Sequence, residues 1–175
     1  ENELLKTAII FGANASGKTN LVKALYFMKA LVLTSSNPLN PVVQSNTPFA
    51  FFDEADKEST LFEIEVIAND IFYDYGFEIT NRQFTKEFLK KRVNGRLIDV
   101  FERGVVGVDL NSSSHKKKGT IGSINTQNLF LSFANTPFLA LDETVVYDLR
   151  NVLNWFNEPN LFIIDAVSYT HLRAH

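Results

Sequence analysis

The order of apolar and polar residues divides the chain into three regions. Residues 8–11 form a continuous apolar run, which is typical of a strand that is buried on both faces. Behind them, residues 21–28 carry apolar side chains at helical spacing. The first region is therefore expected to be a strand, a short loop and a helix.

The middle region has the two-residue period of strands with one polar face. Apolar and acidic residues alternate over 62–66, and apolar residues recur at every second position over 71–79. Turn signals at 69–70 (Asn-Asp) and 94–95 (Asn-Gly) separate the alternating segments. We expect an antiparallel meander over about 49–110, inserted after the first helix.

The last region returns to the helical period from about residue 125. One apolar helix face is expected to consist of Val145, Val146, Leu149, Val152, Leu153 and Phe156. Residues 160–165 suit a short strand. The polar stretches 34–48 and 111–119 are rich in Ser, Asn, Pro or Lys, and we expect them to be surface loops.

Composition excludes several kinds of site. The chain has 17 basic and 20 acidic residues, so its formal net charge of −3 gives no overall signal for nucleic-acid binding. It has no cysteine, which excludes disulfides and cysteine-ligated zinc within these residues. No apolar run approaches the ~20 residues of a membrane-spanning helix. We therefore expect a cytoplasmic location and no membrane partner.

The loop between the first strand and helix carries the strongest chemical signal. It reads G-x-x-x-x-G-K-T over 12–19, in the strand–loop–helix context that a phosphate-binding loop requires. Glycines let consecutive N–H groups turn inward, and the helix adds the positive end of its dipole. Lys18 would reach the β- and γ-phosphates of ATP, and the Thr19 hydroxyl would ligate Mg²⁺. The residues expected to hold the nucleotide are Gly12, Asn14, Ala15, Ser16, Gly17, Lys18, Thr19 and Asn20.

The stretch GANASGKTNLVKAL resembles the ABC-type heads of the SMC, RecF and OLD branch. More narrowly, it is similar to bacterial AAA-type ATP-binding proteins that are grouped with antiphage and abortive-infection ATPases. The resemblance continues in STLFEIEVIANDIFYDYGFEI and, less specifically, in NLFLSFANT and VVYDLRNVLNWF. It implies an α/β P-loop NTPase fold, here the N-terminal lobe of an ABC-type head with an inserted antiparallel meander and a helical segment.

This resemblance also implies an activity and partners. The parent protein is expected to bind ATP and to hydrolyse it with Mg²⁺ between the two heads of a homodimer. An alternative is an ATP-sensing subunit that gates a partner toxin or nuclease, with hydrolysis secondary. A third possibility is the ATPase subunit of a transporter, although the GANASGKTN interior and the long meander argue against it.

Hydrolysis also needs acidic residues for Mg²⁺ and water. Asp142 and Glu143, in FLALDE, and Asp165, in LFIID, imitate the usual apolar strand with a terminal acid. For the first pair we favour a helix cap at Asp142 with Glu143 in the first turn over a metal site. Asp165 is interpreted as a strand-end aspartate. Because no signature like L-S-G-G precedes them, the catalytic acids are expected beyond residue 165.

Three further features have weaker interpretations. The resemblance suggests Gln127 as a glutamine that senses Mg²⁺, but an ordinary helix-start residue is favoured. His115 has no ligand partner in the sequence, so metal binding is not expected there. Two basic clusters are interpreted as solvated surface rather than DNA-phosphate contacts. They are Lys90, Lys91, Arg92 and Arg96, and Lys116, Lys117 and Lys118.

The end of the chain, 166–175, does not read like the end of a domain. Its last nine letters, VSYTHLRAH, match the translation of a transposon adapter used in sequencing libraries, so we expect 166–175 to be non-native. Residues 1–165 are then expected to be a partial P-loop ATPase domain, cut at both ends. Alone, such a fragment is expected to bind nucleotide weakly and to show no ATP turnover.

Overall fold

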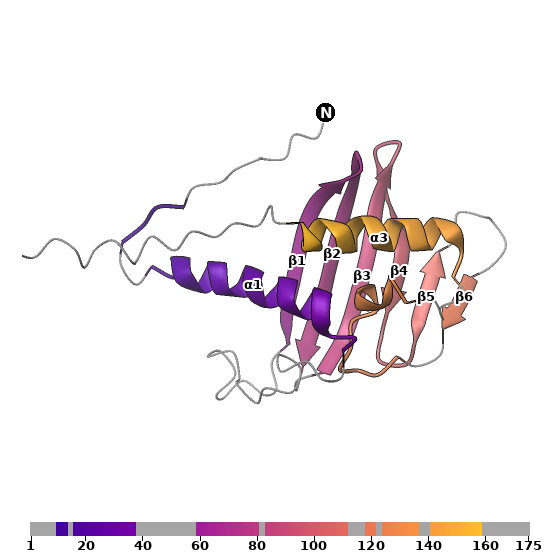
Figure 1. The fold of residues 1–175 in the computed structure, drawn as a ribbon, viewed down its shortest axis with the longest axis horizontal. Coiled ribbons are helices and arrows are strands. Elements are labelled where there is room, and N and C mark those ends of the chain that lie inside the picture. Colours follow the sequence, from indigo (N-terminus) through magenta and orange to yellow (C-terminus); the bar gives the residue numbers. More distant parts are fainter. Residues whose placement is uncertain are drawn as a thin grey trace, which may run out of the picture.

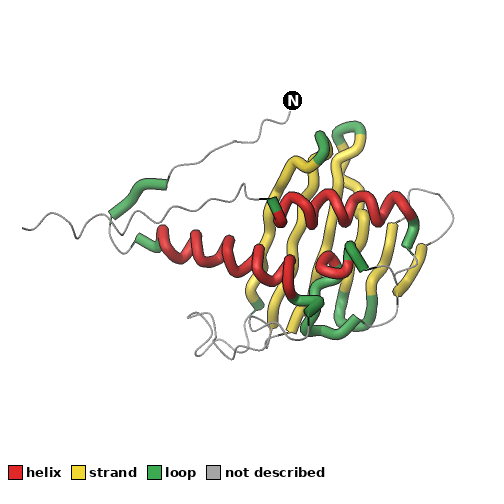
Figure 2. Tube along the Cα trace, in the orientation of Figure 1, coloured by secondary structure: helices red, strands yellow, loops and turns green. Residues whose placement is uncertain are grey.

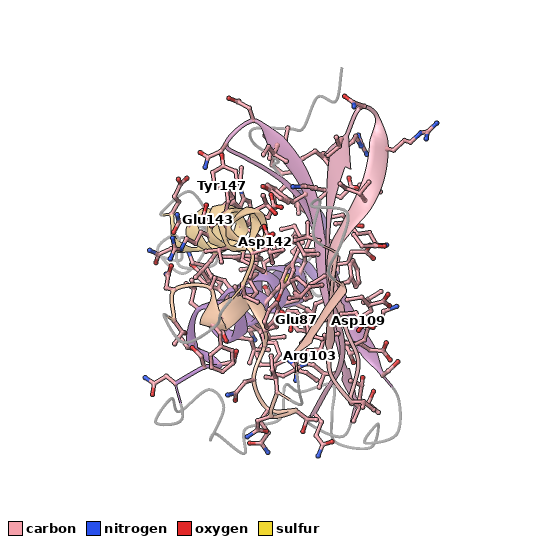
Figure 3. The ribbon with its side chains drawn as sticks, turned by 90° about the vertical axis from the view of Figure 1, so that its right-hand side faces the viewer. Glu87, Arg103, Asp109, Asp142, Glu143 and Tyr147 are labelled. Carbon is pink, nitrogen blue, oxygen red and sulfur yellow. The ribbon has the colours of Figure 1, made fainter. Side chains whose placement is uncertain are left out.

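A computed structural model describes residues 10–13, 16–37, 59–80, 83–111, 118–121, 124–136 and 141–158. Over these residues the chain forms an α/β structure in which helices cover one face of an antiparallel sheet (Figures 1 and 2). The opposite face of the sheet carries no described helix, as the side view in Figure 3 shows. No helix in the described part is long and apolar enough to cross a membrane.

The sheet is a simple meander of six strands that lie in sequence order, each antiparallel to the next. The strands are β1 (Thr60–Ala68), β2 (Ile71–Thr80), β3 (Gln83–Val93), β4 (Arg96–Arg103), β5 (Val108–Asn111) and β6 (Lys118–Ile121). The predicted meander is thus confirmed from Thr60 onward, whereas its expected beginning lies outside the described residues.

Both predicted hairpin turns form where the sequence placed them. Asn69 and Asp70 have φ of 48° and 60°, and Asn94 and Gly95 have φ of 50° and 77°. Two successive left-handed residues match the right-handed twist of the flanking strands, and Asn, Asp and Gly tolerate them best. These turns fix the registers of β1 with β2 and of β3 with β4.

The expected loop over 111–119 differs from the structure at both ends. Asn111 is the last residue of β5, and Lys118 and Gly119 begin β6, which pairs with β5 from Val108↔Ile121 to Asn111↔Lys118. Lysine and glycine are poor strand formers, so the sequence pattern predicts a loop here. Pairing with the otherwise open edge of β5 satisfies their backbone groups instead.

Alternation places the core between the sheet and the helices. On β2, Tyr73, Tyr75 and Phe77 are fully buried and face the helices. They meet the apolar face of α3 (Glu143–Asn157), in which Val145, Leu149, Val152, Leu153 and Phe156 are buried. The predicted α3 face is therefore confirmed, with Val146 only half-buried at its edge.

The helix behind the loop, α1 (Lys18–Thr34), is buried along only part of its length. Met28, Leu31 and Val32, in its C-terminal half, belong to the core. Leu21 and Tyr26, nearer its start, are 47% and 49% exposed. Figure 1 shows this N-terminal half extending beyond the edge of the sheet. The short helix η1 (Leu131–Phe133) packs near the other end of α1.

Candidate phosphate-binding loop

The predicted loop turns sharply into α1 at Gly17. Gly17 has φ of 88°, a left-handed conformation that glycine adopts without steric cost. Its carbonyl oxygen accepts hydrogen bonds from Asn20 N and Leu21 N at 3.0 and 3.1 Å. One residue earlier, Ser16 N donates to Ala13 O at 3.2 Å. The second glycine of the motif is therefore required by the backbone geometry of the turn.

The Lys18 ammonium folds back over the loop. Its Nζ donates to Gly12 O at 2.7 Å and to Ala13 O at 2.6 Å, and it lies 3.2 Å from Ser16 Oγ. A Cβ on Gly12 would lie 2.8 Å from Ser16 Oγ, closer than such atoms approach. A side chain at position 12 would therefore require Ser16 Oγ to move, and the positive charge of Lys18 lies on the carbonyl oxygens of the loop.

The start of α1 suits an anion. No side chain caps the helix at Gly17, and its first turn contains no acidic residue, so none of its own carboxylates opposes the positive end of the dipole. Thr19 is exposed in this first turn. Backbone N–H groups at a helix start, a lysine and an exposed hydroxyl are the donor set that a phosphate with Mg²⁺ requires. Asn14 and Ala15 lie outside the described residues.

Gln127 is not brought to this loop. Two residues further on, Leu129 N donates to Ser35 Oγ at 3.0 Å, and Ser35 is the C-terminal cap of α1. Gln127 itself is exposed, and its backbone N–H donates to Asn125 Oδ1 at 3.0 Å. Thr19 lies in the first turn of the same helix, and the length of helix between Thr19 and Thr34 is about 23 Å at 1.5 Å per residue. The structure therefore places Gln127 beside the wrong end of α1 for a shared Mg²⁺ site.

The capping interpretation of Asp142 is confirmed. Asp142 Oδ1 accepts from Thr144 N at 2.9 Å and from Thr144 Oγ1 at 2.6 Å, and Glu143 occupies the first turn of α3. Figure 3 shows Asp142 and Glu143 at the start of this helix. In the described part of the chain, no three His, Cys, Asp or Glu side chains gather as a metal site would require. Asp165 lies outside the described residues.

The basic cluster at the β3–β4 hairpin is divided between the two faces of the sheet. Lys91 Nζ pairs with Asp148 Oδ2 on α3 at 2.6 Å and is largely buried. On the other face, Lys90 lies 5.0 Å from the Phe88 ring centroid, and Arg92 lies 3.9 Å from that of Phe72.

Only Arg96 of this cluster is fully exposed. The four basic residues of this hairpin therefore do not share one face of the sheet, since Lys91 points toward α3. His115, Lys116 and Lys117 lie outside the described residues.

Sequence reasoning missed a buried ionic cluster between β3 and η1. Glu87 on β3 is fully buried, and its carboxylate accepts from Phe130 N at 2.6 Å, Leu131 N at 3.0 Å and Tyr75 OH at 3.0 Å. Arg103 on β4 lies 3.3 Å from the same carboxylate. Burial raises the pKa of Glu87, while the N–H groups and Arg103 oppose that rise.

Arg103 extends this cluster to the segment before η1. Its guanidinium donates to the carbonyl oxygen of Asn125 at 3.0 Å and to that of Asn128. Figure 3 shows Glu87 and Arg103 pointing toward one another between the sheet and the helices. The segment that carries Gln127 is therefore held to the sheet by one buried ion pair. The sequence signal for this cluster was a charged residue at an inward-facing position of a strand, namely Glu87 on β3 and Arg103 on β4.

A second buried polar network joins α3 to the sheet. Asp148 on α3 accepts from Tyr73 OH at 2.8 Å and binds Lys91. Asn151 donates to the same tyrosine oxygen at 3.0 Å and accepts from Asn69 at 2.6 Å. Burial raises the pKa of Tyr73, so the phenol keeps its proton and remains a donor. This network fixes the helix on the sheet, and none of these hydrogen bonds involves a residue of the loop.

Comparison with known proteins identifies the family of the chain. A family model described as "AAA domain, putative AbiEii toxin, Type IV TA system" matches residues 8–125. The match begins in the apolar segment before the loop, runs through α1 and the whole meander, and covers more than half of the chain. The buried strand predicted over 8–11 is not found in its described part, because residues 10–13 form no strand and Ile10 and Phe11 are 53% and 86% exposed. Neither a curated protein nor a solved structure matches the chain. An AAA domain is a nucleotide-binding P-loop NTPase, and the chain belongs to the AAA domain family so described.

Proposed function

We propose that residues 12–20 bind ATP with Mg²⁺ and that the intact protein hydrolyses ATP. The position of Lys18 carries this proposal. Its ammonium lies on the carbonyl oxygens of Gly12 and Ala13, beside the uncapped start of α1. In this position a small rotation of the side chain exchanges two carbonyl acceptors for phosphate oxygens, so the charge is already held near its ligand.

Different residues of the loop would bind the phosphate oxygens and the Mg²⁺ ion. The N–H groups at the start of α1 would bind phosphate oxygens, with Gly17 providing the backbone turn that directs them. Lys18 would neutralise charge on the β- and γ-phosphates. The Thr19 hydroxyl would hold Mg²⁺, which supplies further charge neutralisation when it is bound.

We further propose that two such heads close on ATP in a homodimer, and that the protein acts in the cytoplasm. The dimer rests on the resemblance of the loop to ABC-type heads, and the location rests on the sequence, in which no apolar run approaches the ~20 residues of a membrane-spanning helix. A second candidate function is an ATP sensor that gates a partner toxin or nuclease in antiphage defence. The family description, which names a toxin–antitoxin system, favours this alternative.

The test of ATP binding compares two lysines on α1. We expect Lys18→Ala to weaken ATP binding at least about tenfold, or ~1.4 kcal/mol, because it removes the point charge and leaves the backbone turn in place. Isothermal titration calorimetry with ATP and Mg²⁺ measures this change. Lys23→Ala is the matched control, since Lys23 is exposed on the same helix and lies outside residues 12–20.

An equal loss of affinity in both variants, or none in Lys18→Ala, would overturn the assignment of the loop. Phosphate release by the intact protein then separates the two functions. Turnover that disappears in Lys18→Ala supports the ATPase, whereas tight binding with negligible turnover supports the sensor.

A further inference from the structure

On the outer face of the sheet, which points away from the helices, acidic side chains lie along β1 and β2 and basic side chains lie along β3. β1 carries Glu63 and Glu65 on this face, and β2 carries Asp74 and Glu78. β3 contributes the basic column, which consists of Lys86, Lys90 and Arg92. The registers place these side chains on the face opposite Tyr73, Tyr75 and Phe77, which point toward the helices. Most are solvated, as the alternation of their strands requires.

Asp74 is the exception on this face because it is only 7% exposed. In the register of the sheet it lies directly between Glu65 on β1 and Lys90 on β3. Its Oδ1 atom is inaccessible to solvent and has no hydrogen-bond partner. A buried carboxylate oxygen without a hydrogen-bond partner is rare, because no interaction in the folded protein compensates for the free energy of its lost hydration.

The neighbouring cations do not compensate for this carboxylate. Lys90 directs its ammonium to the ring of Phe88, and Arg92 covers the ring of Phe72. The Phe88 ring fills the space above Gly76, where a Cβ would lie 2.6 Å from the ring. Among the described residues, neither cation forms an ion pair with Asp74. The long side chains of β3 therefore bury the aspartate without a direct ion pair, and Lys90 acts on it only through its charge.

The nearest acidic neighbours make ionisation of Asp74 more costly. Glu65 is directly opposite, and Glu63 is diagonal to Asp74 on the same face. Like charges on opposed strand positions destabilise a sheet. Burial first, and then the charge of Glu63 and a hydrogen bond with its side chain, raise the pKa of Asp74, whereas Lys90 opposes the rise.

We propose that Asp74 carries a proton and donates it in a hydrogen bond to Glu63 across β1 and β2, and that this carboxyl pair makes the attachment of β1 sensitive to pH. β1 is an edge of the described sheet, so its pairing with β2 is its main contact within the sheet. The proton replaces a repulsion between two carboxylates by a hydrogen bond. Loss of the proton leaves three acidic side chains facing one another at this edge.

The direction of the pH effect follows from the raised pKa. The folded state binds this proton more tightly than the unfolded chain, in which the pKa is near its ordinary value of 3.8. The contribution to stability is therefore complete below that value and is lost as the pH rises through the raised pKa. The charged groups that face Asp74 are Glu63 and Glu65 from β1 and Lys90 and Arg92 from β3.

Thermal unfolding of wild-type protein and of Asp74→Asn tests the proposal. The amide imitates the protonated carboxyl at every pH. We expect equal Tm values near pH 4 and a gain for the variant at pH 8, of roughly 2–4 °C for a chain of this size. Glu63→Gln is expected to behave in the same way. Glu65→Gln is the matched control, which removes a charge from the same strand and face but leaves the hydrogen-bonded carboxyl pair.

Several outcomes would overturn the proposal. One is a Tm difference that does not change with pH, and another is an equal gain in Glu65→Gln, which would indicate simple repulsion. A rise in wild-type Tm on addition of Mg²⁺ or Ca²⁺ that Asp74→Asn lacks would show a bridging cation instead of a proton. If the variants fail to fold, carbon NMR of the wild-type Asp74 carboxyl decides, since a titration midpoint at the ordinary 3.8 contradicts a proton held by Asp74.

Discussion

At the scale of single residues, the ion pair of Glu87 and Arg103 is the largest departure from an apolar core. Moving two charges out of water costs several kcal/mol per ion, and their attraction offsets that cost only with further hydrogen bonds. Here the Glu87 carboxylate has two backbone N–H donors and Tyr75, while Arg103 has two carbonyl acceptors. The pair therefore organises irregular backbone before η1 that would otherwise have unsatisfied polar groups.

Removal of one partner should be far worse than removal of both. We expect Glu87→Ala to lower the free energy of unfolding by about 3–5 kcal/mol, because Arg103 and two N–H groups are left buried without their acceptor. Urea denaturation measures the loss. The double variant Glu87→Leu, Arg103→Met should recover part of it. A loss under about 1 kcal/mol in Glu87→Ala would show that water reaches this site.

At the scale of elements, the cap of α3 decides between a structural and a catalytic role for Asp142. Its carboxylate is already used twice by Thr144, at 2.9 and 2.6 Å, in the way that helix starts require. The helix that it begins holds the Asp148 network against the sheet. An acid with this geometry stabilises α3, and no group of three or more His, Cys, Asp or Glu side chains forms a metal site among the described residues.

We expect Asp142→Ala to lower the free energy of unfolding by about 1 kcal/mol, with ATP affinity unchanged. Asp142→Ser is the matched variant, since a serine hydroxyl caps helices nearly as well and should retain most of the stability. Chemical denaturation and calorimetry with ATP measure the two properties separately. Loss of Mg²⁺-dependent ATP binding together with unchanged stability would instead support a role for Asp142 as a Mg²⁺ ligand.

Elements with local causes could be predicted from the sequence. The hairpin turns depend on two adjacent residues, and the α3 face depends on its own periodicity, so both follow from short stretches of chain. The phosphate loop is local in the same sense, because Gly12, Gly17 and Lys18 interact within a few residues. β6 could not be predicted, since its strand conformation comes from pairing with β5. The position of Gln127 likewise depends on Glu87, Arg103 and Ser35, which are distant in sequence.

At the scale of the whole molecule, α1 joins two environments. Its C-terminal half is part of the core, and Ser35 at its end accepts from Leu129 N and donates to Ser132 Oγ at 3.1 Å. Its N-terminal half carries the loop and leaves Leu21 and Tyr26 half-exposed. One end of the helix is therefore anchored to the sheet, while the end that would bind ATP makes few packing contacts among the described residues.

This asymmetry predicts how α1 responds to nucleotide. Without ATP, amides over 18–26 should exchange with deuterium faster than those over 28–34, because sparsely packed helix turns open at lower free energy. With ATP and Mg²⁺, protection should rise over 18–26 and change little over 28–34, where packing already limits opening. Hydrogen-exchange mass spectrometry measures both segments. Lys18→Ala should remove the added protection and leave the slow segment unchanged. Equal protection along the whole helix upon binding would instead mean that α1 opens as one cooperative unit with the sheet.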